Sequence, residues 1–256
     1  MKTGLIYQPC GLGDILFVQK IAHHIKSLGY EICWPVIPQF KWLNDYISDF
    51  TFISDSETKY IPYQGLVIPN HLNFPGKEFY SIENKTKISE DLFFFQGFLT
   101  CDPIMRGKYD SIGIDWKDWR DYINFNRNIE KENSLYYDVL GLKDDDEYVF
   151  VNRNFCTVPN PDVYSNISID ENYYGYKVVE MNIVPGYSLF DWCKVLENST
   201  EINMVETAFN FILESPTLFD KVKDKKLTLH HRCTSPYNNK YWDDVNYLFN
   251  LPWNYR

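Results

Sequence analysis

The segment Gln8-Pro9-Cys10-Gly11-Leu12-Gly13-Asp14-Ile15-Leu16 constrains the fold of this chain more than any other. It follows an apolar run over residues 4–7 and precedes apolar positions with helical spacing that end at Gly29. A strand, a glycine turn and a helix in this order are typical of the start of a Rossmann-like unit. The glycines allow a tight turn and close approach of a ligand. The segment therefore predicts an α/β domain with a ligand site at this turn.

Asp14 lies in the first turn of the predicted helix, where the helix dipole favours a carboxylate. A carboxylate at the mouth of a parallel sheet can act as a general base, and an aspartate at a helix start can equally be a cap. The third glycine of the dinucleotide fingerprint is missing, because position 16 is Leu, which disfavours a dehydrogenase. The segment alone leaves catalysis and capping both open.

The strand–helix alternation starts twice, which predicts two Rossmann-like domains joined near residues 128–147. We expect an N-terminal domain over 1–140, a second domain over 141–235 and a closing helix within 236–256 that returns to the first domain. Strands are predicted over 30–36, 51–53, 65–69, 148–151, 177–181, 201–205 and 227–230. Helices are predicted over 39–48, 90–99, 133–141, 188–197, 209–213 and 241–251.

The composition excludes several classes of partner. A net charge of −10 argues against a nucleic-acid backbone or an anionic membrane. The six cysteines are scattered without metal-ligand spacing, so we expect reduced thiols, no metal site and a cytoplasmic protein. We also expect no signal peptide and no membrane span, because neither a leader pattern nor a long apolar run occurs. The acidic run 144–147 is interpreted as a solvated turn.

Polar residues follow several of the predicted strands, where α/β sheets bind ligands. Glu206-Thr207-Ala208 offers a hydroxyl and backbone N–H groups for a phosphate, and Arg153 would add positive charge. Glu180 suits a ribose hydroxyl pair. His71 follows the strand 65–69 and is a pocket candidate, although a loop histidine without a role fits as well. The segment His230-His231-Arg232 fits a cap or linker, or a group that reaches a cleft between the two predicted domains.

Three stretches together resemble GT-B glycosyltransferases, nearest to the inverting, heptosyltransferase-like families that use nucleotide sugars. Residues 11–16 resemble the N-terminal (Gly/Ser)-x-Gly-Asp-(Ile/Val)-(Leu/Ile) motif, whose Asp is the proposed base. Residues 151–154 fall where those enzymes open the C-terminal domain with a basic phosphate contact. Residues 190–192 and 202–209 resemble the segment that binds the diphosphate of the donor. The resemblance implies two domains that face each other across a cleft.

The resemblance implies direct displacement at the anomeric carbon, with inversion and without a metal or cofactor. Asp14 would be the catalytic base, and the nucleotide sugar and a glycan acceptor would be the partners of a monomer or homodimer. The acceptor or sugar would contact Gly11, Leu12, Gly13 and His71. The donor would contact Asn152, Arg153, Glu180, Met181, Glu206, Thr207 and Ala208.

Departures from the family pattern support an alternative, a non-catalytic nucleotide- or sugar-binding protein with a degenerate GT-B fold. The family often has Asp at the position of Glu206, Gly at Ala208 and His at Phe211. The family's phosphate-binding Lys is not evident near Arg153. An epimerase of nucleotide sugars also has two facing domains, but no separate His/Glu arrangement in the chain favours it.

Overall fold

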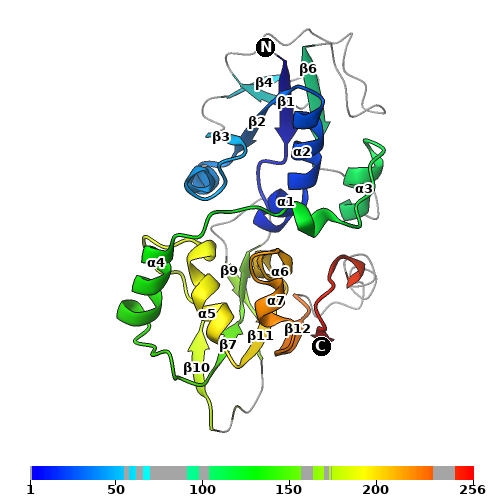
Figure 1. Ribbon diagram of the computed structural model, residues 1–256. Helices are drawn as coiled ribbons and strands as arrows, with labels where there is room; N and C mark the ends of the chain where they lie inside the picture. Colours follow the sequence, from blue (N-terminus) through cyan, green and yellow to red (C-terminus); the bar gives the residue numbers. More distant parts are fainter. Residues whose placement is uncertain are drawn as a thin grey trace. The chain divides into compact units, whose positions relative to one another are not determined.

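The computed structural model describes residues 2–54, 58–61, 66–69, 91–97, 104–156, 164–169, 173, 175–232 and 246–256. The chain forms two compact units, Met1–Asn126 and Arg127–Arg256, and each contains a parallel sheet with helices (Figure 1). The predicted α/β class is therefore confirmed. The boundary precedes helix α4 (Ile129–Asn133), so the segment 127–140 belongs to the second unit, whereas the sequence pattern assigns it to the first.

The first unit is built on a parallel sheet with the strand order β3-β2-β1-β6 (Figure 1). Its strands are β1 (Thr3–Tyr7), β2 (Glu31–Val36), β3 (Thr51–Ser54) and β6 (Leu92–Gln96). Leu5 lies opposite Cys33 of β2 and Phe94 of β6, which makes β1 a central strand. The predicted strand at 65–69 forms instead, as β5 (Leu66–Pro69), an antiparallel pair with β4 (Thr58–Ile61).

Helices of the first unit pack through aromatic side chains. They are α1 (Leu12–Phe17), α2 (Gln19–Ser27), η1 (Pro38–Asp45), α3 (Ile104–Asp110) and η4 (Trp119–Tyr122). The ring of Phe17 lies 4.9 Å from that of Tyr109 and 5.2 Å from that of Trp119. These contacts join α1, α3 and η4, so the turn that begins α1 rests on a packed core.

The prediction of a buried helix over 90–99 is wrong, because this segment contains strand β6. Four consecutive apolar residues, Leu92 to Phe95, are all buried. A strand of a parallel sheet that is covered on both faces has a continuous apolar run instead of an alternating one. Such a short run has no periodicity that separates a strand from a helix.

The second unit has a parallel sheet with the order β10-β7-β11-β12-β13. Its strands are β7 (Tyr148–Asn152), β10 (Lys177–Glu180), β11 (Glu201–Val205), β12 (Lys226–His230) and β13 (Asn254–Tyr255). Phe150 points to one face, where it meets the rings of Trp192 and Phe209. Val149 and Val151 point to the other face and pack with Ile169. A separate antiparallel pair is formed by β8 (Asn154–Cys156) and β9 (Tyr164–Asn166).

Most helices of the second unit follow the predicted pattern. They are α4, η5 (Ser134–Val139), η6 (Leu189–Trp192), α5 (Cys193–Asn198), α6 (Ala208–Glu214), α7 (Phe219–Val222) and η8 (Asn246–Leu248). Ser188 caps η6, and its backbone N–H donates to Asp191 Oδ2 at 2.7 Å. Within the described residues of both units, no helix has the length and apolar character needed to cross a membrane.

The predicted closing helix is wrong over 246–256, and residues 233–245 lie outside the described residues. The described end contains the short η8 and then β13, whose strand pairs with β12. The backbone N–H of Arg256 donates to the carbonyl of Leu229 at 2.9 Å. The open edge of β12 supplies these backbone partners, which a sequence pattern of apolar side chains cannot reveal. This end therefore belongs to the second unit.

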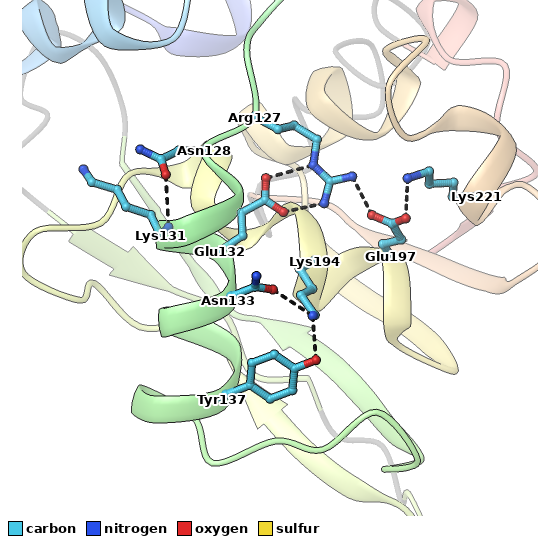
Figure 2. Close-up of polar contacts among 9 residues, drawn as sticks. All are labelled: Arg127, Asn128, Lys131, Glu132, Asn133, Tyr137, Lys194, Glu197 and Lys221. Atoms are coloured by element: carbon cyan, nitrogen blue, oxygen red, sulfur yellow. Dashed lines mark hydrogen bonds and ion pairs between the residues drawn. The ribbon is translucent and has the colours of Figure 1, made fainter.

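A partly buried ionic network ties α4 to α5 and α7 (Figure 2). We call Arg127, Glu132, Glu197 and Lys221 the Arg127 network. The Nε of Arg127 donates to Glu132 at 2.8 Å and its Nη1 donates to Glu197 at 2.6 Å, while Lys221 pairs with Glu197. The hydrogen bond to Glu132 is the main reason that the pKa of Arg127 lies above its ordinary value. The network explains why the unit boundary precedes α4.

Candidate functional site

The strand order of the first unit reverses between β1 and β6. The chain passes from β1 to β2 and β3 on one side, and β6 then pairs with the other side of β1. In open α/β sheets, ligands bind beyond the carboxyl ends of the strands at such a reversal. β1 ends at Tyr7 and β6 at Gln96, so Gln8–Asp14 and Gly97 lie at this point. The predicted glycine turn is therefore at the expected ligand position of this sheet.

Gly11 makes the turn with a left-handed backbone, φ 78°, directly before α1. Leu12 and Gly13 begin the helix, and Asp14 lies in its first turn as predicted. A Cβ at position 11 would lie 2.5 Å from Oδ2 of Asp14, so only glycine leaves room for this carboxylate. Gly11 thus has two functions: it permits the backbone conformation and accommodates Asp14.

Asp14 forms an ion pair with Lys108, a residue of α3 that the sequence analysis missed. The Nζ of Lys108 lies 2.6 Å from Oδ1 of Asp14, and it also donates to Oε1 of Gln8 at 2.8 Å. The side chain of Lys108 is 2% exposed and that of Asp14 is 32% exposed. We call Gln8, Asp14 and Lys108 the Asp14 cluster. It combines a buried cation with a carboxylate that solvent reaches.

Two further contacts fix the Asp14 cluster in place. The amide of Gln8 donates from Nε2 to the carbonyl of Cys10 at 2.6 Å, and a Cβ on Gly97 would lie 2.7 Å from Oε1 of Gln8. Tyr109, next to Lys108, donates from its hydroxyl to the carbonyl of Phe17. The position of Lys108 is therefore set by the anchoring of α3 on α1.

The thiol of Cys10 lies beside the cluster without taking part in its hydrogen bonds. Burial and, to a smaller extent, the charge of Asp14 raise the pKa of Cys10 to about 11, against an opposing effect of Lys108. A thiol with this pKa stays protonated at neutral pH and is a poor nucleophile. The chemistry available here is therefore that of the Asp14 carboxylate.

The strand order of the second unit reverses between β7 and β11, in the 2-1-3-4-5 arrangement of a doubly wound sheet. Asn152 is the last residue of β7, and Glu206, Thr207 and Ala208 directly follow β11. Asn152 lies opposite Met204 in the register of the two strands. The structure therefore brings together, at the carboxyl edge, the residues predicted to bind the donor from these two strands.

The other residues predicted to bind the nucleotide-sugar donor lie on the β7 and β10 side of this edge. Arg153 pairs with Glu180, with Nη1 and Oε1 2.8 Å apart, and both side chains are partly exposed. Met181 is buried, and its N–H donates to the carbonyl of Val151 at 2.8 Å. Arg153 and Glu180 thus contact each other, although the sequence analysis assigns them to separate parts of the ligand.

Thr207 caps helix α6 in a capping box with Asn210. Its hydroxyl accepts from the N–H of Phe209 at 3.4 Å, and its own N–H donates to Oδ1 of Asn210 at 2.8 Å. Glu206 is buried, and its N–H donates to the carbonyl of His230 at 3.0 Å. Ala208 begins the helix. The local arrangement explains this segment as a helix start that lies at the sheet reversal.

A second arginine, Arg232, lies beside Glu206 after the end of β12. Its Nε donates to the carbonyl of Glu206 at 2.8 Å, and its guanidinium lies 5.9 Å from the ring centre of Phe155. The sequence places Arg232 after His230 and His231, in a group that fits a cap, a linker or a group reaching the cleft. The structure adds this cation to the edge that holds Thr207.

Two predictions on ligands concern other parts of the chain. His71 lies outside the described residues. Within the described ranges, no group of three or more His, Cys, Asp or Glu side chains comes together as a metal site would require. In the acidic run, Asp146 pairs with Lys177 at 3.3 Å, which agrees with a solvated turn.

Comparison of the chain with protein-family models, with curated proteins and with solved structures finds no match. Inferences about function therefore rest on the two sheets and on the residues at their strand-order reversals.

Proposed function

We propose that the protein is a glycosyltransferase that moves a sugar from a nucleoside-diphosphate sugar to an acceptor hydroxyl of a glycan, with inversion. The observation that carries the proposal is the position of the residues in the family-like motifs. Asp14 lies at the strand-order reversal of the first sheet, and Asn152 and Thr207 lie at that of the second. These are the positions at which α/β sheets bind ligands.

In the proposed reaction, Asp14 accepts the proton of the acceptor hydroxyl as a general base. The acceptor oxygen forms a bond to the anomeric carbon while the bond from that carbon to the diphosphate oxygen breaks. The electron pair leaves with the nucleoside diphosphate. Attack opposite the leaving group inverts the configuration of the sugar.

The second unit would hold the donor at the edge formed by β7, β11 and β12. The Thr207 hydroxyl and an arginine would stabilise the charge that develops on the diphosphate. Arg153 and Arg232 both pair with a carboxylate, Arg153 with Glu180 at 2.8 Å and Arg232 with Glu206 at 3.9 Å, so each is a candidate for this function. The longer pairing distance favours Arg232, whose Nε also donates to the carbonyl of Glu206 at 2.8 Å.

The test is a panel of nucleotide sugars with glycan acceptors, assayed for transfer and for slow hydrolysis of the donor. Asp14→Asn should lower the rate of transfer about 10²–10⁴-fold, the contribution of a positioned base, and leave nucleotide binding intact. Transfer should persist in EDTA, as the resemblance to metal-independent enzymes implies. Undiminished turnover by the Asn variant would remove Asp14 from the role of base.

A second candidate function is a non-catalytic protein that binds a nucleotide or sugar. The ion pair of Asp14 with the buried Lys108 favours it, because the carboxylate then has a structural role in holding α3. The same panel separates the two candidates: thermal stabilisation by nucleotide sugars without hydrolysis or transfer, with acceptors present, would favour the binding protein.

A further inference from the structure

The two oxygens of the Asp14 carboxylate have different surroundings. Oδ1 accepts a hydrogen bond from Lys108, whose ammonium is almost completely buried. Oδ2 lies against Gly11, at the place that a side chain at position 11 would occupy. No hydrogen bond from the described residues reaches Oδ2. Because the Asp14 side chain is 32% exposed, a ligand or water can reach the carboxylate.

The charge of Lys108 depends on Asp14 for its balance. The other partner of its ammonium is the neutral amide of Gln8. Among the described residues, the thiol of Cys10 also interacts with both charges, and it is protonated at neutral pH. A buried ammonium needs a charged partner, so the ion pair holds the Asp14 carboxylate against Lys108.

We propose that Lys108 is a positioning residue that fixes Oδ1 of Asp14, so that Oδ2 receives the proton of the acceptor hydroxyl. This inference rests on the proposed glycosyl transfer. Lys108 does not touch the reacting atoms; it acts through Asp14, whose orientation it maintains. After the transfer, the proton passes from Oδ2 to water through the exposed side of the side chain, and the ion pair is restored.

Three substitutions of Lys108 test this function. Lys108→Met removes the charge and both hydrogen bonds, while Lys108→Gln retains a donor and removes only the charge. Lys108→Arg retains the charge. We expect kcat to fall about 100-fold in the Met variant, the loss associated with a small misplacement of a catalytic group, with the KM for the nucleotide sugar unchanged.

Comparison of kcat with KM in the variants distinguishes positioning from a structural role. A variant that only loosens the fold should change the thermal stability and the KM as well, whereas loss of positioning should lower kcat alone in the Met and Gln variants. The Arg variant, which keeps the charge, should restore kcat to within about 10-fold of the wild-type value. If the Met variant does not fold, the Gln variant provides the same measurement.

Lys20→Met is the matched control. Lys20 is also an ion-paired lysine of the first unit, with Asp118 as its partner and with a hydrogen bond to the carbonyl of Asp115 at 2.6 Å. Its loss should leave kcat unchanged. If the wild-type protein transfers no sugar, the proposed function fails and this inference fails with it. If the wild type is active and the Gln variant keeps the wild-type kcat, only the inference is overturned.

Discussion

The two units each contain an ionic group with a buried member, and the two groups differ in what they leave accessible. In the Arg127 network, the carboxylate of Glu132 is 1% exposed and both of its oxygens accept from Arg127 (Figure 2). In the Asp14 cluster, the cation is the buried partner, and the described residues give the carboxylate a hydrogen bond at Oδ1 and none at Oδ2. In the Arg127 network the buried carboxylate is fully engaged by Arg127, whereas in the Asp14 cluster the carboxylate is partly exposed to solvent.

The positions of the two groups in their units agree with this difference. The Arg127 network lies among helices α4, α5 and α7, whereas the Asp14 cluster lies at the carboxyl edge of a sheet beside its strand reversal. Burial of charge is therefore not by itself a mark of function. The partly exposed Asp14 carboxylate and its position at the strand reversal distinguish a candidate site from an ion pair that only stabilises the fold.

The largest expected effect on stability is that of Glu132→Gln. Glu132 is 1% exposed and both of its oxygens accept from Arg127, which keeps Glu197 as its other carboxylate partner, so the free energy of unfolding should fall by about 3–5 kcal/mol. Urea denaturation followed by circular dichroism measures it. Glu130→Gln, on the exposed side of α4, is the control and should change the free energy by less than about 0.5 kcal/mol. A loss in Glu132→Gln as small as that of the control would mean that the Arg127 network contributes no stability.

Gly11→Ala should have the next largest effect and should separate backbone strain from displacement of Asp14. Gly29→Ala is its match, because both glycines have positive φ, 78° and 88°, and only Gly11 has Asp14 within contact distance. The shared backbone cost is about 1–2 kcal/mol. Crowding of Oδ2 should add about 1–3 kcal/mol at position 11 and reduce the transfer rate as well. Identical unfolding curves and activities would contradict the close packing of Asp14.

The smallest effect concerns the response of the Arg127 network to acid. Burial by itself raises the pKa of Glu197, but hydrogen bonds from Lys221 and Arg127 outweigh it and hold the pKa below the ordinary value of 4.5. A carboxyl group whose pKa is lowered in the folded state stabilises the fold at pH values above its ordinary pKa. This stabilisation is lost as the pH falls through the lowered pKa. The urea midpoint should therefore fall on acidification below about pH 4.5, and less steeply in Glu197→Gln than in the wild type.

The sequence predicted the elements whose signals are local. The turn at Gly11, the helix predicted over 188–197 and the restart of the alternation at residue 148 all follow from neighbouring residues, and the structure confirms them. The prediction failed at β6, whose apolar run has no period. That error also concealed the strand reversal of the first sheet and the position of α3, and hence the contact of Lys108 with Asp14.

What the sequence determined by itself is the α/β class, the glycine turn and the polar residues that follow β1, β7 and β11. These depend on backbone preferences and on the apolar periodicity of short segments. Only the tertiary structure decided the partners: Lys108 reaches Asp14 across 94 positions of the chain, and Glu180 pairs with Arg153. The physical reason is that parallel strands and buried ion pairs join distant segments, and no local pattern encodes which segments will meet.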